Sequence, residues 1–97
     1  MKRDEVIRIL KEHQDELADR FGVQSLALFG SVARDQALPG SDVDLLVEFN
    51  RPVGLFKLFA LQERLEALLG CPVDLGTPNS LKARVRPRVL TEALNVI

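Results

Sequence analysis

The chain has 97 residues, of which 46% are hydrophobic and 28% charged, a composition typical of one folded domain over residues 1–97. Its 13 basic and 14 acidic residues give a net charge of −1, so no overall basic excess favours nucleic acid. With Cys71 as the single cysteine, an internal disulfide is excluded, and we expect a cytoplasmic protein. No apolar run approaches the about 20 residues of a membrane-spanning helix, so we expect no contact with a membrane.

The first part of the chain is predicted to form a buried strand between two helices. Apolar residues at helical spacing predict a long helix over residues 4–21, which a glycine would end. Residues 23–29 are mostly apolar and bounded by glycines, as in a buried strand. A short helix is expected over residues 31–34, and Pro39 with Gly40 has the composition of a type II turn.

The second part continues the alternation of strands and helices. Polar and apolar residues alternate over residues 42–49 with the period of two of a half-buried strand. A second long helix is predicted over residues 55–69, a short strand over 72–75, and a helical tail over 80–97 that Pro87 interrupts. This order of elements predicts an α/β or α+β domain with one small sheet.

Two aspartates, Asp42 and Asp44, begin the alternating strand and are expected to project from the same face, about 6.5 Å apart. Carboxylates at this distance repel each other unless a cation lies between them. Mg²⁺ prefers oxygen ligands and would remove the conflict, so the pair predicts a magnesium site. The alternative is two solvated acids at the start of a strand.

Gly30 and Ser31 stand at the turn from the first strand into the short helix. Such a turn presents backbone N–H groups to a phosphate, and the Ser31 hydroxyl would add a donor or cap the helix. A phosphate cradle beside a two-carboxylate metal site favours chemistry on a nucleoside triphosphate. Asp74 completes a three-carboxylate site if its strand lies beside residues 42–49. Otherwise it is an aspartate on an edge strand.

Other catalytic and metal motifs fail on spacing. An EF-hand loop starting at Asp42 would need an oxygen ligand at Leu46 and a glycine at Val47. The Gly-Lys-Ser/Thr of a P-loop does not occur, and one histidine with one cysteine argues against zinc. His13 is the only histidine and lies at the edge of the first helix's apolar stripe, so we expect no Ser-His-Asp triad.

The sequence resembles the DNA polymerase β-type nucleotidyltransferase superfamily in one spaced motif, which is Gly30-Ser31, ten further residues, Asp42-x-Asp44 and a later lone Asp74. The short length, the block GSVARDQALPGSDVDLLVEF and the ending VDLGTPNSLKARVRPRVLTEA are similar to its minimal nucleotidyltransferase (MNT) branch. The resemblance covers nearly the whole chain. It implies a nucleotidyltransferase-like fold in which a small mixed sheet is backed by helices.

The same resemblance implies a role for each site residue. Gly30 and Ser31 would hold the triphosphate of ATP or another nucleoside triphosphate, with Arg34 as a further phosphate contact. All three aspartates would bind Mg²⁺, and Asp74 would also activate the attacking hydroxyl. The glycine common in the family after this arginine is Asp35 here, which affects only the expected shape of the loop.

Members of the MNT branch are similar to antitoxins that pair with HEPN-domain ribonuclease toxins and transfer AMP to a toxin tyrosine. The resemblance therefore implies an enzyme that transfers AMP from ATP to a hydroxyl of a HEPN-domain partner. The alternative is a non-catalytic antitoxin that blocks its partner sterically.

Two surface features bear on the choice of partner, which we expect to supply part of the pocket of so small a domain. Phe56 and Phe59 project away from the leucine stripe of helix 55–69. They form either a patch for a partner or a second copy of the chain, or a second buried face. The tail has no acid between Asp74 and Glu92. Its basic residues predict a solvated face or contact with nucleic acid or an acidic partner. They are Lys82, Arg84, Arg86 and Arg88.

Overall fold

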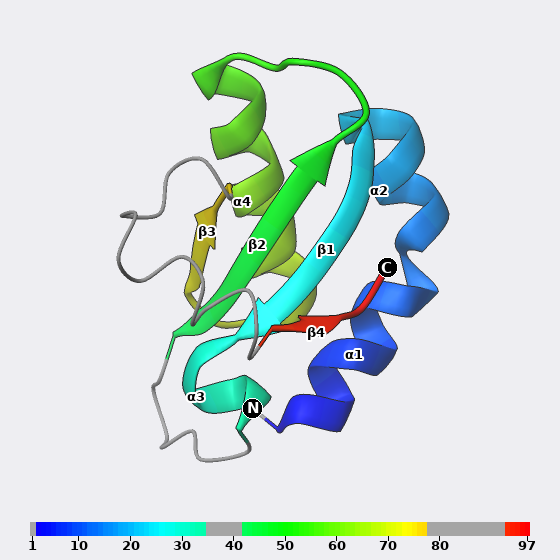
Figure 1. Cartoon of the computed structure of the whole chain (residues 1–97). Helices are drawn as coiled ribbons and strands as arrows, with labels where there is room; N and C mark the ends of the chain where they lie inside the picture. The colour runs from blue at the N-terminus through cyan, green and yellow to red at the C-terminus, as the bar shows by residue number, and fades with distance from the viewer. Residues whose placement is uncertain (1, 35–41, 78–92) are drawn as a thin grey trace.

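The computed structural model describes residues 2–34, 42–77 and 93–97. Within them the strands form one mixed sheet in the order β3-β2-β1-β4 (Figure 1). The strands are β1 (Val23–Phe29), β2 (Val43–Phe49), β3 (Val73–Gly76) and β4 (Leu94–Asn95). β2 pairs antiparallel with β1 and parallel with β3, and β4 pairs antiparallel with β1. The prediction of an α/β domain with a small mixed sheet is confirmed.

The helices cover one face of this sheet (Figure 1). They are α1 (Arg3–Glu12), α2 (Gln14–Phe21) and α4 (Leu55–Leu69), with the single-turn α3 (Gly30–Ala33) at the end of β1. β2 directs three fully buried side chains toward the long helices, namely Val43, Leu45 and Val47. Because side chains alternate along a strand, Asp44 and Glu48 point to the opposite face. The core therefore lies on one side of the sheet, and the acidic side chains of β2 lie on the other.

The prediction of one helix over residues 4–21 is wrong, because the chain forms two helices there. At His13 the backbone N–H bonds to the Leu10 carbonyl oxygen three residues back, at 3.2 Å, which tightens the last turn of α1. α2 then ends at Gly22, which adopts the left-handed region at φ 71°. The predicted apolar stripe is nevertheless buried on both helices, at Val6, Leu10, Leu17 and Phe21.

The end of the chain is a strand and not the predicted helix. β4 pairs with β1, and the Val96 N–H donates to the Leu26 carbonyl oxygen at 2.8 Å. This pairing satisfies backbone groups on the outer edge of β1 and buries the Val96 side chain in the core. The earlier part of the tail, with Pro87 and its basic side chains, lies outside the described residues, and so does the turn predicted at Pro39.

The remaining elements follow the predictions closely. β1 and α4 have the predicted bounds, β2 begins one residue later at Val43, and β3 is shifted by one residue to Val73–Gly76. α3 begins at Gly30, one residue before the predicted start. None of the described helices is long and apolar enough to cross a membrane.

Candidate active site

The register of two parallel strands brings two predicted metal ligands together. Asp44 on β2 is the register partner of Asp74 on β3. Register partners on neighbouring strands lie side by side, about 4.8 Å apart in the direction of the hydrogen bonds. Asp42 comes immediately before β2 and is exposed at the same end of the strand. The third strand therefore lies beside β2, and Asp74 is next to Asp44.

The turn after β1 lies against the same carboxylate. Phe29, the last residue of β1, is the register partner of Asp44, so α3 begins directly beside it. Gly30 adopts φ 75°, and the Asp44 carboxylate occupies the space that a Cβ atom on Gly30 would take. Ser31 follows in the first turn of α3 and is half-buried. The predicted phosphate cradle and the predicted metal ligands thus meet at one point.

The charges around Asp44 also converge. Burial raises the pKa of the Asp44 carboxyl above its ordinary value of 3.8, and the negative charges of Asp74 and Asp42 raise it further. The positive charge of Arg34 opposes this and lowers the pKa. The charges of Asp74, Asp42 and Arg34 are therefore the ones that act on the Asp44 carboxyl. The structure therefore brings Gly30, Asp44 and Asp74 together, while Asp35 lies outside the described residues.

A hard divalent cation fits the chemistry of these donors. Carboxylate oxygens are the ligands that Mg²⁺ prefers, and a cation would offset the repulsion that raises the pKa of Asp44. Within residues 2–34, 42–77 and 93–97, however, no group of three or more His, Cys, Asp or Glu side chains is arranged to hold a metal ion. The Asp44–Asp74 pairing is in place, and magnesium binding by the three aspartates stays a prediction.

Two side chains of α4, which the sequence analysis missed, hold the strand that carries Asp74. Glu66 accepts the Val73 N–H at 2.9 Å, and the Gln62 amide nitrogen donates to the Val73 carbonyl oxygen at 3.0 Å. Val73 directly precedes Asp74, so these bonds fix the backbone next to the predicted ligand. The sequence held a signal, because residues 62 and 66 are four apart on one helix face shortly before a strand.

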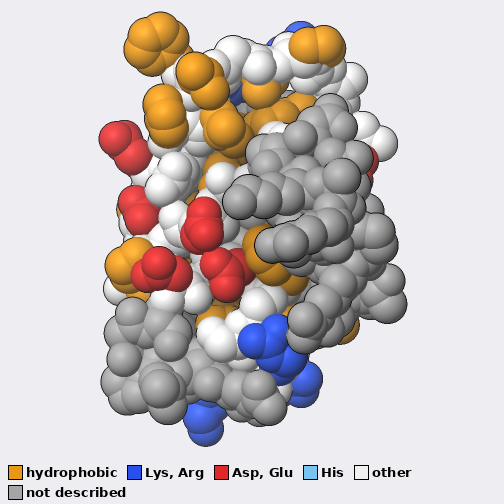
Figure 2. Space-filling model, turned by 60° about the vertical axis from the view of Figure 1, so that its left-hand side comes forward, with side chains coloured by type: hydrophobic (Ala, Val, Ile, Leu, Met, Phe, Trp, Pro, Cys, Tyr) orange, Lys and Arg blue, Asp and Glu red, His pale blue; other side chains and the backbone are white. Residues whose placement is uncertain are grey.

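Acidic and apolar side chains gather in different parts of one face of the molecule. Figure 2 shows acidic side chains gathered on one face, with hydrophobic side chains gathered at one end of it. Phe56 is 92% exposed and Phe59 55% exposed, and the neighbouring Leu55 is also exposed. The interpretation of these phenylalanines as a second buried face is therefore wrong. The buried side of α4 consists of Leu61, Leu65 and Leu69.

The N-terminal end of α4 borders an open groove of about 840 Å³. Its walls include Glu48 and Asn50 near the end of β2, Leu55 and Leu58 of α4, and Thr77 after β3. None of the six predicted site residues lines it. The groove therefore lies at the end of β2 remote from Asp44 and is separate from the carboxylate site.

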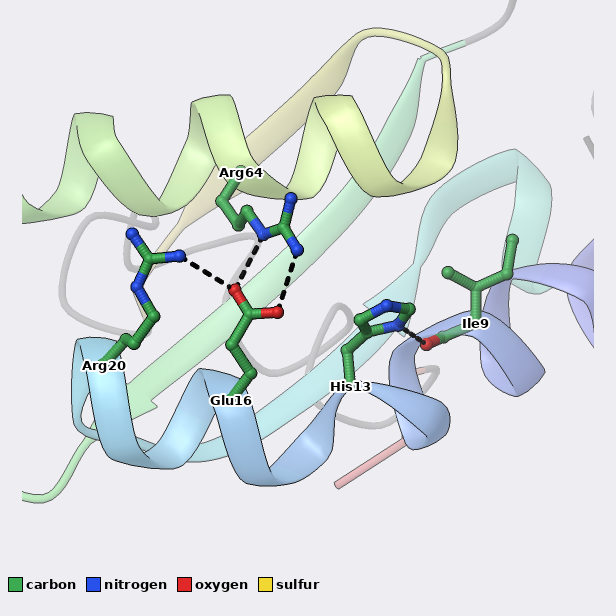
Figure 3. Close-up of polar contacts among 5 residues, drawn as sticks. All are labelled: Ile9, His13, Glu16, Arg20 and Arg64. Atoms are coloured by element: carbon green, nitrogen blue, oxygen red, sulfur yellow. Dashed lines mark hydrogen bonds and ion pairs between the residues drawn. The ribbon is translucent and has the colours of Figure 1, made fainter.

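Figure 3 shows the polar contacts of His13 and Glu16, which lie away from the carboxylate site. The His13 ring nitrogen Nδ1 donates to the Ile9 carbonyl oxygen at 2.9 Å, so this histidine stabilises the break between α1 and α2. Glu16 of α2 accepts two hydrogen bonds from Arg64 of α4, at 2.7 and 2.9 Å, and one from Arg20 at 3.1 Å. The bonds from Arg64 lower the pKa of Glu16, although burial opposes them.

Comparison with known proteins identifies the family of this chain. The family model described as nucleotidyltransferase domain matches residues 10–96. The chain belongs to this nucleotidyltransferase family. It is 45% identical over 93 residues to the protein adenylyltransferase MntA of Thermococcus cleftensis, an alignment that covers 96% of this chain and 94% of that protein.

Solved nucleotidyltransferase structures share the fold. One described as a minimal nucleotidyltransferase is 39% identical, with a TM-score of 0.80 over 97% of this chain and 95% of that one. A complex of a tri-AMPylated Shewanella oneidensis HEPN toxin with an MNT antitoxin contains a chain 19% identical, with a TM-score of 0.66 over 94% and 71% of the two chains. At that identity the likeness shows the fold alone. The predictions of the MNT family and of a nucleotidyltransferase enzyme are confirmed.

Proposed function

We propose that this nucleotidyltransferase transfers AMP from ATP to a hydroxyl group of a partner protein, with Mg²⁺ as cofactor. The observation that carries the proposal is the register of Asp44 with Asp74 directly beside the Gly30 turn. This arrangement puts potential metal ligands next to a turn suited to phosphate. The adenylyltransferase activity named for the Thermococcus relative supports AMP as the transferred group and a protein as the acceptor.

Each site residue has a role in this reaction. Asp42 and Asp44 would hold Mg²⁺, which when bound neutralises charge on the α-phosphate and the leaving pyrophosphate. Gly30 and Ser31 orient the triphosphate through backbone N–H groups and the hydroxyl. The acceptor oxygen bonds to the α-phosphorus while the bond from that phosphorus to the β-bridging oxygen breaks, releasing pyrophosphate. Asp74, which would be the third ligand, accepts the proton of the acceptor hydroxyl.

The partner is a HEPN-domain toxin, and its surface completes the pocket. The complex of an MNT antitoxin with a tri-AMPylated HEPN toxin supports this class of acceptor. The exposed side chains of Leu55, Phe56 and Phe59 support a protein contact, since a cluster of large apolar side chains in water is typical of an interaction surface. A second copy of the chain is the other occupant that the experiment below distinguishes.

Radiolabelled ATP tests the reaction directly. The protein is incubated with Mg²⁺, a HEPN-domain protein, and ATP labelled either at the α- or at the γ-phosphate. We expect label on the HEPN protein only from α-labelled ATP, because the γ-phosphate leaves with pyrophosphate. Label from γ-labelled ATP would indicate phosphoryl transfer instead. Tight binding with no label from either nucleotide would favour the non-catalytic antitoxin, which blocks its partner sterically.

The substitution Phe56→Glu tests the apolar surface. Because Phe56 is 92% exposed, the variant should keep its fold and Tm while its affinity for the HEPN protein falls at least about tenfold. Ala67→Glu is the matched control, since it adds the same charge on an exposed position of the same helix three turns away. Calorimetric titration measures affinity, and sedimentation of the protein alone reports self-association. A Phe56→Glu variant with unchanged affinity for both the partner and itself contradicts the assignment.

A further inference from the structure

We infer that Gly30 is a positioning residue for Asp44. Because it has no side chain, Gly30 lets the Asp44 carboxylate lie directly over the turn between β1 and α3. The predicted metal ligand is thereby held at the place where the triphosphate would bind. The catalytic consequence rests on the proposed function, whereas the positioning itself follows from the backbone.

The contact involves one residue on each side. A Cβ atom on Gly30 would collide with Oδ2 of Asp44 and would lie 3.0 Å from its Cγ and 3.3 Å from its Cβ. Real Cβ atoms do not approach carboxylate oxygens so closely, so a side chain at position 30 would have to displace the carboxylate. Glycine is therefore required here for space as well as for its φ of 75°.

The backbone of Asp44 has no room to retreat. Asp44 is paired with Phe29 on one side and with Asp74 on the other, in the middle of the sheet. Moving its Cα would break register with both neighbouring strands. Relief must come from rotation of the Asp44 side chain, which carries the carboxylate away from its present position. The predicted metal ligand would then leave the turn that is proposed to bind the triphosphate.

A second glycine provides a matched control within the same chain. Gly70 has φ 71°, close to that of Gly30, but a Cβ atom there would meet nothing within 4 Å. Gly70→Ala therefore measures the backbone strain of a left-handed alanine alone. Gly30→Ala measures the same strain together with the collision against Asp44.

Thermal unfolding in the presence of a chelator separates these contributions. We expect Gly70→Ala to lower Tm by about 4–8 °C. Gly30→Ala should lower Tm further than Gly70→Ala does, because displacing the Asp44 carboxylate adds to the strain. In an Asp44→Ala background the excess should disappear, since the oxygen and Cγ atoms that collide are gone. An equal cost of Gly30→Ala in both backgrounds overturns the inference. If Gly30→Ala alone does not fold, recovery of folding in Gly30→Ala/Asp44→Ala supports the inference, and its failure overturns it.

Binding of Mn²⁺, followed by the electron paramagnetic resonance of the free ion, tests the ligand position without any enzyme assay. Gly30→Ala should weaken Mn²⁺ binding by at least about tenfold, while Gly70→Ala leaves it unchanged. Wild-type Mn²⁺ affinity in Gly30→Ala overturns the inference. The comparison of Tm values does not depend on whether the protein transfers AMP. A failure of the proposed function can therefore be told apart from a failure of this inference.

Discussion

Two carboxylates of this protein, Asp44 and Glu16, lie in opposite electrostatic surroundings. The Asp44 carboxyl is partly buried and is influenced by the charges of two further aspartates, and both effects raise its pKa. Glu16 accepts hydrogen bonds from Arg64 and Arg20 across the contact of α2 with α4, and its pKa is lowered. The charge of Asp44 is therefore unfavourable in the folded chain, whereas that of Glu16 is favourable.

A difference of this kind is typical of that between residues that bind a ligand and residues that stabilise a fold. The arginines around Glu16 already supply the opposite charge, so the group needs nothing from solution. At Asp44 a single arginine, Arg34, opposes the charges of two aspartates. A site that collects like charge at the cost of folding free energy is typical of functional sites, where the bound ion or substrate completes the balance.

The substitution Asp44→Asn should have the largest effect, and it should lower activity while raising stability. Transfer of label from ATP should fall by at least about 10²–10³-fold, because a group aimed at developing charge is lost. Tm at neutral pH in chelator should rise, because the folded state no longer holds a charge that burial and two aspartates disfavour. Added Mg²⁺ should raise the Tm of the wild type but not of this variant.

The pH dependence of Tm shows whether the charge of Asp44 destabilises the folded state. The raised pKa of Asp44 means that the folded state binds its proton more tightly than the unfolded state, whose value is about 3.8. The cost of the Asp44 charge is complete above the raised pKa and is relieved as the pH falls through it. The Asp44→Asn variant should lack this pH-dependent change in Tm. The Glu48→Gln variant should keep it, because Glu48 is exposed on the same face of β2 and Asp44 is unchanged. An Asp44→Asn variant that is active, or less stable than the wild type at neutral pH, contradicts the comparison.

The substitution Glu66→Ala should have an intermediate effect, through the backbone next to Asp74. Loss of the acceptor for the Val73 N–H should destabilise the chain by about 1 kcal/mol. It should also lower kcat for AMP transfer with little change in KM for ATP, because Asp74 would be held less firmly. Glu66→Gln keeps an oxygen acceptor and should restore kcat. Glu63→Ala, exposed on the same helix, is the control. A lost kcat that the glutamine does not restore contradicts a positioning role.

The sequence predicted those features that depend on local pattern. The alternation in residues 42–49 predicted β2. The spacing of Gly30-Ser31 with the aspartates predicted that Gly30, Asp44 and Asp74 lie close together, as strand register places them. The hydrogen bonds of Glu66 to β3 and of Glu16 to Arg64 were missed. The second joins residues 48 positions apart, and no local pattern marks either partner. The strand β4 was also missed. Its two residues form a strand because they pair with the outer edge of β1, and their own strand propensity does not reveal this.

The substitution Glu16→Gln should have the smallest effect and should leave activity unchanged. Because the pKa of Glu16 is lowered, its stabilising contribution is complete above its ordinary value of 4.5 and is lost as the pH falls through the lowered pKa. Wild-type Tm should therefore decline in this acidic window more steeply than the Tm of Glu16→Gln. Glu12→Gln is the control, because Glu12 forms an exposed pair with Arg8 within α1 alone. Parallel curves of Tm against pH for wild type and Glu16→Gln would show that the contact between α2 and α4 does not depend on this charge. The charge of Glu16 would then not stabilise the fold, which contradicts the contrast drawn with Asp44.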